Sequence, residues 1–141
     1  MQGKDIENII KNISQDEKGI KFNFLYNLQK KFQEEVCNKI GYYDEKISEL
    51  PTNNIRVYQY HCMCLLEELG ELIKSDKRWK NFRNSKYDKD NKLEEIADCF
   101  IVLYNICLFS GFSDKEIEQA IFDKILGNFD RICKNNIHPF V

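Results

Sequence analysis

The chain has 141 residues, with 21 lysines and arginines, 23 aspartates and glutamates, and a formal net charge of −2. This balance disfavours a dedicated nucleic-acid binder, because such proteins concentrate positive charge against phosphates. No stretch approaches the roughly 20 apolar residues that cross a bilayer and no apolar signal segment opens the chain, so we expect a cytoplasmic protein with no membrane partner and six reduced, core-forming cysteines.

Helices should dominate the fold, because only two prolines and six glycines interrupt the sequence. A short helix is expected over about residues 4–14, where isoleucines recur at helical spacing. A second is expected over about residues 21–40, ending at Gly41. Residues 41–54 should be irregular, since they contain Pro51 and two consecutive asparagines.

Three further helices are expected in the second half of the chain. The third should span about residues 54–75, the fourth about 92–110, and the fifth should run from Asp114 to about residue 133. Between the third and fourth, residues 76–92 lack periodicity and are expected to form a loop. The prediction is an all-α, compact bundle of four to five helices, with an N-terminal extension over 1–20, a main domain over 21–134 and a tail over 135–141.

Acidic side chains cluster on the third expected helix. Glu68 and Glu71 are three residues apart, so they lie on one face of the helix, and Glu67 adds a charge beside them. Such a pattern is also common on solvated helix faces. Taken alone, it does not indicate a site.

The fourth expected helix repeats the spacing with Glu95 and Asp98. Asp98 opens the apolar stretch "DCFIVLYNICLF", and a helix that is apolar on nearly every side is usually buried, so we expect Asp98 to be buried or at least walled in by apolar side chains. A buried carboxylate needs a cation, either a basic side chain or a metal. Two such helices packed antiparallel would form an all-oxygen site suited to Mg²⁺ or Mn²⁺. His61 is expected to be an ordinary helical residue.

Positive charge is concentrated in two segments. Residues 76–92 hold seven basic against three acidic residues, and they include Trp79 and Lys80. On the fifth helix Lys124, Asn128 and Arg131 fall on one stripe. Both segments could attract a polyphosphate, yet a solvated loop and a helix C-terminus favoured by the dipole explain them equally well. Trp79 could stack on a base or anchor the loop.

In chain order these motifs are "EELGE", "RWK", "EEIAD" and "KILGNFDR". Together they resemble the all-α nucleoside triphosphate pyrophosphohydrolase superfamily, which includes MazG proteins, dimeric dUTPases, dCTP pyrophosphatases and phosphoribosyl-ATP pyrophosphatases. The signature of that superfamily is E-E-x-x-E, a spacer, then E-x-x-D. The resemblance covers about residues 22–132, and the final Lys-x-x-x-Asn-x-x-Arg stripe is most similar to dCTP pyrophosphatase and MazG-like members.

The resemblance implies Mg²⁺-dependent cleavage of a nucleoside triphosphate to the monophosphate and pyrophosphate, by a homodimer or homotetramer. It implies that the metal ligands are Glu68, Glu71, Glu95 and Asp98, with Glu67 and Glu94 as supporting acids or alternative ligands, and that one of these carboxylates positions the attacking water. The phosphates would be bound by Lys124, Asn128 and Arg131 with help from Lys80, and Trp79 would border the site. The N-terminal extension and the long basic spacer depart from the pattern.

Two other functions stay open at this point. A non-catalytic helical oligomerisation or adaptor module would carry the same charged stripes, and phosphoribosyl-ATP is a second candidate substrate. The base is undecided among side chains that could read or stack on it: Tyr26, Gln29, Gln33, Tyr60 and Asn105. Gly70, inside the third helix, predicts either close helix packing or the approach of a ligand.

Overall fold

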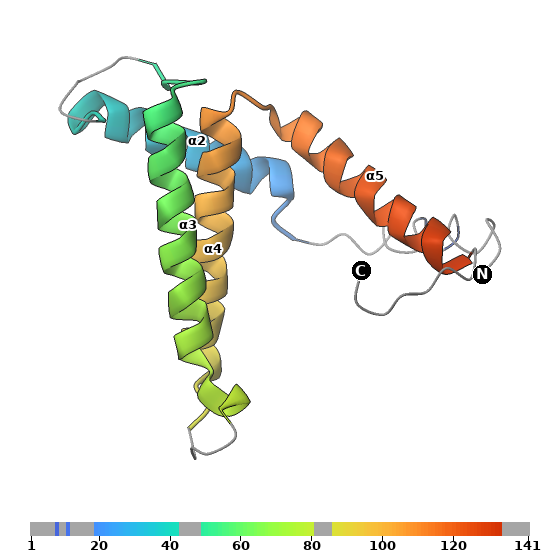
Figure 1. The fold of residues 1–141 in the computed structure, drawn as a ribbon. Helices are drawn as coiled ribbons and strands as arrows, with labels where there is room; N and C mark the ends of the chain where they lie inside the picture. The colour runs from blue at the N-terminus through green and yellow to red at the C-terminus, as the bar shows by residue number, and fades with distance from the viewer. Residues whose placement is uncertain (1–7, 9–10, 12–18, 43–48, 81–85, 134–141) are drawn as a thin grey trace. The chain divides into compact units, whose positions relative to one another are not determined.

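The computed structural model describes residues 8, 11, 19–42, 49–80 and 86–133. These residues form helices and no strand, which confirms the all-α prediction. The α-helices, shown in Figure 1, are α2 (Phe22–Lys39), α3 (Ile55–Ser75), α4 (Lys89–Phe109) and α5 (Asp114–Cys133), and the short 3₁₀-helix η1 spans Lys77–Trp79. The helix expected near residues 4–14 lies almost wholly outside the described residues.

The helices begin and end at the residue types expected from the sequence. Gly41 and Gly111 take the left-handed conformation, with φ of 77° and 81°, directly after α2 and α4. Asn54 caps α3 by accepting hydrogen bonds from the backbone amides of Arg56 and Val57, at 3.0 and 3.4 Å. These residue types stop and start helices because they satisfy backbone groups that the helix leaves without partners.

The loop expected over residues 76–92 is shorter than predicted. It contains η1, and α4 begins at Lys89 instead of Lys92. Asp88 is the physical reason, since its carboxylate accepts hydrogen bonds from the backbone amides of Asp90 and Asn91, at 3.1 Å each, and so caps the earlier start.

The chain divides into two compact units. One comprises residues 26–113, and the other combines residues 1–25 with 114–141. Each unit is described by itself below, and the division expected at residues 20 and 134 stays a prediction. No single helix among the described residues is long and apolar enough to cross a membrane.

The core of the 26–113 unit lies where α3 and α4 pack side by side as an antiparallel hairpin, beside α2 (Figure 1). Among the residues described in this unit, seven apolar side chains are buried: Tyr26, Cys37, Val57, Cys99, Val102, Leu108 and Phe109. Hydrogen bonds tie the end of α4 to this core, since the Tyr26 hydroxyl donates to the Phe112 carbonyl at 2.8 Å. The cysteines whose side chains are described are free thiols.

His61 is a core residue, a role that its sequence context does not reveal. Its side chain is 4% exposed, and its ring stacks on Phe109 at 4.6 Å and 12°. Tyr42 and Tyr60 meet the imidazole edge-on, at 5.9 and 5.1 Å between ring centroids. No hydrogen-bond partner for Nε2 occurs among the described residues. Burial lowers the pKa of His61 to about 4, so the ring is neutral at pH 7.

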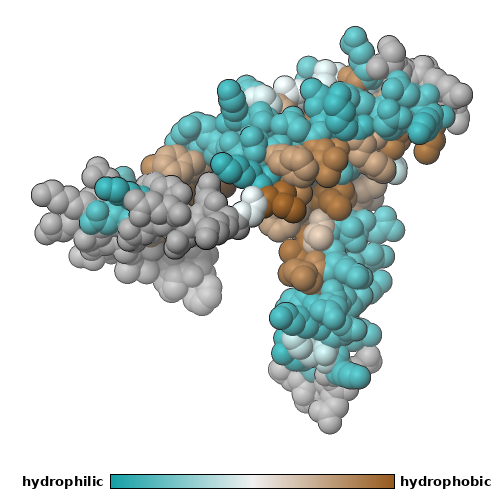
Figure 2. All heavy atoms as spheres, turned by 180° about the vertical axis from the view of Figure 1, so that it is seen from behind, coloured by the Kyte–Doolittle hydropathy of each residue, from teal (hydrophilic) through white to brown (hydrophobic). Residues whose placement is uncertain are grey.

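The expectation that α4 is buried on nearly every side is wrong. Phe100, Ile101 and Leu103 are 55%, 40% and 42% exposed, although Val102 between them is buried. Within its unit the helix packs along one side, and its other apolar residues remain uncovered. Figure 2 shows hydrophobic side chains gathered over the part of the hairpin that adjoins α2, with hydrophilic ones nearer its loop.

Candidate active site

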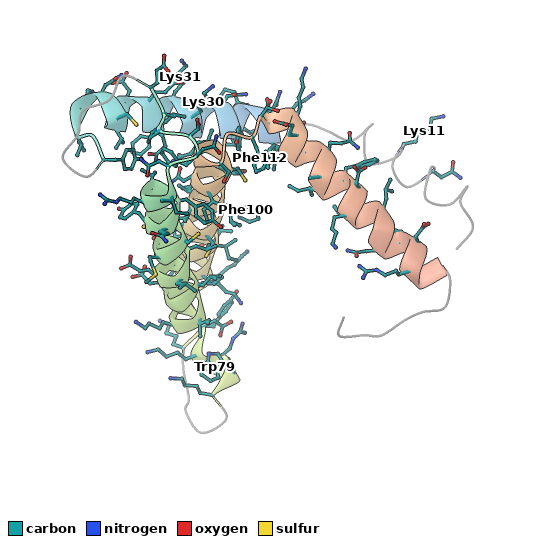
Figure 3. The ribbon with its side chains drawn as sticks, turned by 45° about the horizontal axis from the view of Figure 1, so that its top comes forward. Lys11, Lys30, Lys31, Trp79, Phe100 and Phe112 are labelled. Atoms are coloured by element: carbon teal, nitrogen blue, oxygen red, sulfur yellow. The ribbon has the colours of Figure 1, made fainter. Side chains whose placement is uncertain are left out.

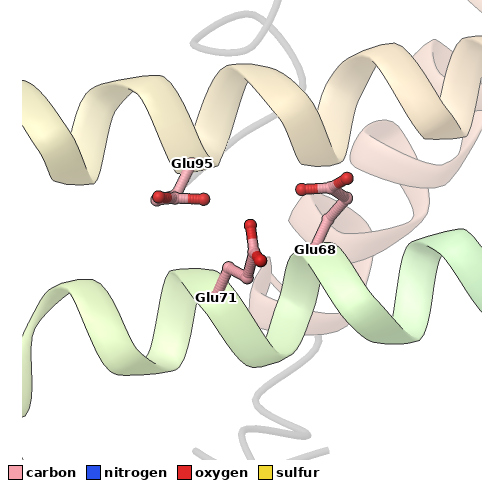
Figure 4. A group of neighbouring side chains, drawn as sticks. All are labelled: Glu68, Glu71 and Glu95. Carbon is pink, nitrogen blue, oxygen red and sulfur yellow. The ribbon is translucent and has the colours of Figure 1, made fainter.

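Three carboxylates from the α3–α4 hairpin converge on one point. Each of Glu68, Glu71 and Glu95 offers an oxygen, and these oxygens lie within 4.8 Å of one another. Figure 4 shows Glu68 and Glu71 projecting from α3 towards α4, and Glu95 projecting back from α4. The i, i+3 spacing stacks the two α3 acids on one face, and the antiparallel packing brings Glu95 opposite them.

Burial and neighbouring carboxylates disfavour the charged forms of Glu68 and Glu95. Burial is the first cause that raises the pKa of Glu68, followed by the charges of Asp98 and Glu71. For Glu95, burial again comes first in raising the pKa, followed by Glu71 and Asp98. Glu67 adds to the effect on Glu68, and Glu94 to that on Glu95. A cation at this point would relieve the repulsion.

No side chain supplies that cation in the part of the chain that the structure describes. None of the ion pairs there includes Glu68, Glu71 or Glu95. All three members of the cluster are carboxylates, so the cluster offers hard oxygen donors at close range. Such a set fits Mg²⁺ or Mn²⁺ and suits softer metals poorly.

Asp98 does not occupy the position expected of it. Its side chain is exposed, so the prediction of a buried carboxylate is wrong. The reason is the open side of α4, which leaves the first turn of the apolar stretch in contact with solvent. Asp98 lies outside the group of three converging oxygens, although its charge still acts on Glu68 and Glu95.

Trp79 lies at the loop end of the hairpin (Figure 3). Its ring is 61% exposed, and its Nε1 donates a hydrogen bond to the Ile73 carbonyl at 3.4 Å. The ammonium group of Lys80 lies 5.1 Å from the centre of the Trp79 ring. Trp79 borders a depression of about 590 Å³, whose other lining residues are Leu72, Ile73, Asp76, Arg78, Lys92 and Ile96.

A charged clamp holds this end of the hairpin, and sequence reasoning missed it. Asp76 accepts hydrogen bonds from Arg78 Nε and Nη2 at 2.8 and 2.7 Å, and from Lys92 Nζ at 2.9 Å. These bonds, Arg78 first, hold the pKa of Asp76 well below its usual range. The Arg78 guanidinium also lies 3.7 Å from the centre of the Tyr87 ring. The Asp-x-Arg spacing beside a helix end was the available signal.

The expected phosphate-binding stripe lies on α5, in the other compact unit. Lys124, Asn128 and Arg131 are exposed, and Arg131 Nη2 donates a hydrogen bond to Asn128 Oδ1. Asn128 thus orients the guanidinium on the helix surface. The role of the stripe stays a prediction.

Candidate base-reading side chains have partners within the protein. Gln29 Nε2 donates to Asn105 Oδ1 at 2.9 Å, which links α2 to a buried position of α4. The Tyr42 hydroxyl donates to Gln33 Oε1. The bond between Gln29 and Asn105 therefore holds the hairpin against α2, and the bond between Tyr42 and Gln33 holds the segment after α2 against that helix.

Comparison with known proteins gives one family match. A family model described as dUTPase matches residues 21–126, which include the whole of α2, α3 and α4 and thus the acidic cluster. No curated protein and no solved structure matches the chain significantly. Hydrolases of this kind are typically metal-dependent, and the converging carboxylates agree with that property. The chain belongs to the all-α dUTPase and MazG-like family, whose members are hydrolases acting on nucleoside triphosphates.

Proposed function

We propose that this protein hydrolyses a nucleoside triphosphate, either a deoxynucleotide or a non-canonical one, to the monophosphate and pyrophosphate with Mg²⁺. The observation that carries the proposal is the convergence of Glu68, Glu71 and Glu95 within 4.8 Å, on a segment that the family model covers. Acids that approach so closely without a basic partner among the described residues favour a divalent cation.

The metal would be held by Glu68, Glu71 and Glu95, with Asp98 at the edge of the cluster. When bound, Mg²⁺ neutralises charge on a phosphate chain and lowers the pKa of bound water. Asp98 is exposed and lies outside the converging oxygens, so its carboxylate is available to orient the attacking water and accept its proton. Glu67 and Glu94 add negative field that strengthens cation binding.

The remaining proposed roles concern the binding of the phosphates and of the base. Lys124, Asn128 and Arg131 would bind phosphate oxygens, because lysine offers a point charge and arginine a fork of donors. Lys80 would assist them, and Trp79 would border the nucleotide. We also propose that the active form is a homodimer or homotetramer.

The direct test is pyrophosphate release from a panel of canonical and modified nucleoside triphosphates, with Mg²⁺ or with EDTA. Glu71→Gln should lower the rate on the order of 1,000-fold, since it removes a negative oxygen from the cluster while keeping the shape of the side chain. Glu35→Gln is the matched control. Glu35 lies on α2 and pairs only weakly with Lys39 at 3.4 Å, so its loss should leave the rate unchanged.

A thermal-shift screen separates an enzyme from a purely structural helical module. A nucleotide that binds only the native protein stabilises it by about 2.7 kcal/mol at 100 times its Kd. We expect such a shift with Mg²⁺ and a non-hydrolysable nucleotide together, and a smaller one with either alone. A panel that gives neither turnover nor any shift would contradict the proposed function and favour the structural module.

A further inference from the structure

A lysine lies one helical turn from the acidic cluster. Lys92 precedes Glu95 by three residues on α4, so the two side chains are neighbours on the helix surface, with Cβ atoms about 5–6 Å apart. Glu95 is the acid that α4 contributes to the converging carboxylates. Lysine and glutamate at this spacing commonly pair on a helix surface. Such a pair would place a positive charge where a divalent cation should bind.

The structure pairs Lys92 with Asp76 instead of with Glu95. Lys92 Nζ lies 2.9 Å from Asp76 Oδ2, and no ion pair of the described residues joins Lys92 to Glu95. The same ammonium lies 5.7 Å from the centre of the Tyr87 ring. Asp76 directly follows α3, so its bond to Lys92 spans the two helices at the loop end of the hairpin.

The surroundings of Asp76 strengthen its bond to Lys92. The side chains of Asp76 and Lys92 are 14% and 33% exposed, against 62% and 76% for the surface pair of Glu35 and Lys39, so water screens the first pair less. Arg78 also donates to the Asp76 carboxylate through its backbone amide, Nε and Nη2. A carboxylate fixed by several charged donors offers Lys92 a defined acceptor.

We propose that Asp76 is a positioning residue of the metal site, which holds the Lys92 ammonium across the hairpin and so leaves Glu95 to a divalent cation. The inference rests on the proposed function, because it requires that the cluster binds a metal. Without Asp76, the Lys92 side chain turns along α4 to Glu95, where its charge neutralises the acid and repels the metal. Asp76 lies outside the converging carboxylates and acts through Lys92.

A purely structural role for the clamp gives a different expectation. If the bond mattered only because it ties α4 to the end of α3, removal of either partner would disturb the cluster equally. If Asp76 restrains Lys92, only the loss of Asp76 is harmful, because a chain without Lys92 has no ammonium to restrain. The two single variants therefore separate the explanations.

The test measures the affinity of the full chain for Mn²⁺ by electron paramagnetic resonance, without nucleotide. Asp76→Asn keeps the shape of the side chain but presents a neutral amide to Lys92. It should weaken Mn²⁺ binding on the order of 10-fold, because an ammonium about 5 Å from a divalent ion repels it even at the dielectric constant of water. Lys92→Met should bind Mn²⁺ at least as tightly as the wild type does.

Double variants identify the lysine responsible. Asp76→Asn combined with Lys92→Met should recover the Mn²⁺ affinity of the wild type. The matched control combines Asp76→Asn with Lys74→Met, and it should stay about 10-fold weaker. Lys74 is exposed, follows Glu71 by three residues on α3, and forms no ion pair with another described residue. Thermal unfolding in EDTA checks that each variant folds.

Three results would overturn this inference alone. They are unchanged Mn²⁺ binding by Asp76→Asn, failure of Lys92→Met to rescue that variant, and a loss of affinity in Lys92→Met itself. The last result decides the matter even if Asp76→Asn does not fold. A wild type that neither binds Mn²⁺ nor releases pyrophosphate would overturn the proposed function, and this inference with it.

Discussion

The two sides of the α3–α4 hairpin have opposite chemistry. One side brings Glu68, Glu71 and Glu95 together with no basic partner among the described residues. The other leaves Leu66 and Phe100 more than half exposed. Both arrangements are unfavourable for a lone chain in water, the first because of charge repulsion and the second because of apolar hydration. A cation would relieve the first cost, and any cover over the apolar side chains would relieve the second.

One helix contributes side chains to both sides of the hairpin, because consecutive residues project about 100° apart around the helix axis. Glu68 and Leu69 are neighbours in sequence, yet one points towards α4 and the other towards solvent. Val102 and His61 are buried, and each lies seven residues, about two helical turns, from an acid of the cluster, Glu95 and Glu68 respectively. Changes to either side should therefore affect different properties, and the following predictions use this independence.

The largest expected effect comes from the acidic side. Glu95→Gln should lower catalysis on the order of 1,000-fold, because it removes a negative oxygen from the converging set. The same change should raise the melting temperature of the metal-free protein, because it removes repulsion from Glu71 and Asp98. Calorimetry in EDTA and a pyrophosphate assay measure the two properties. The oligomeric mass should stay that of the wild type, and a variant that becomes monomeric would contradict the separation of the two sides.

Much of the hairpin was predictable because its signals are local. Asn54 begins α3 and Gly111 follows α4, and both residue types act through the backbone beside them. The meeting of Glu68 and Glu71 with Glu95 needed one further assumption, that two helices joined by a loop pack antiparallel. The assumption was sound, since α3 and α4 pack side by side.

The errors arose where burial depends on what covers a helix. A long apolar stretch predicted that Asp98 is buried, but hydrophobicity does not say whether the cover comes from the same chain. For His61 the sequence underestimated burial. A lone histidine in a helix gives no sign that Phe109, nearly fifty residues later, stacks on it. The clamp of Asp76 on Lys92 is likewise a contact between distant residues.

A smaller effect tests the buried core of the 26–113 unit. The pKa of His61 is about 4 in the folded protein and 6.5 when unperturbed, so between these values the unfolded chain binds a proton that the folded protein refuses. Stability is therefore full above pH 6.5 and falls as pH decreases towards 4, by about 2 kcal/mol between pH 7.5 and 5. His61→Phe keeps the stack on Phe109 and should abolish this part of the loss.

Urea unfolding of wild type and His61→Phe at the two pH values measures that difference. Tyr60→Phe is a suitable control, since it keeps the ring that meets His61 edge-on and leaves the imidazole in place. It should retain the full pH dependence of the wild type. If His61→Phe loses as much stability as the wild type on acidification, other groups carry the dependence.

The smallest effect concerns Gly70, which lies inside α3. No described atom lies within 4 Å of the position that a Cβ would take there, so none of the described residues requires the glycine. Gly70→Ala should therefore raise the free energy of unfolding by about 0.5 to 1 kcal/mol, because alanine loses less backbone entropy in a helix. Urea unfolding at a fixed protein concentration measures the gain. A loss of stability would contradict the prediction and would show that a ligand or another helix approaches α3 closely at Gly70.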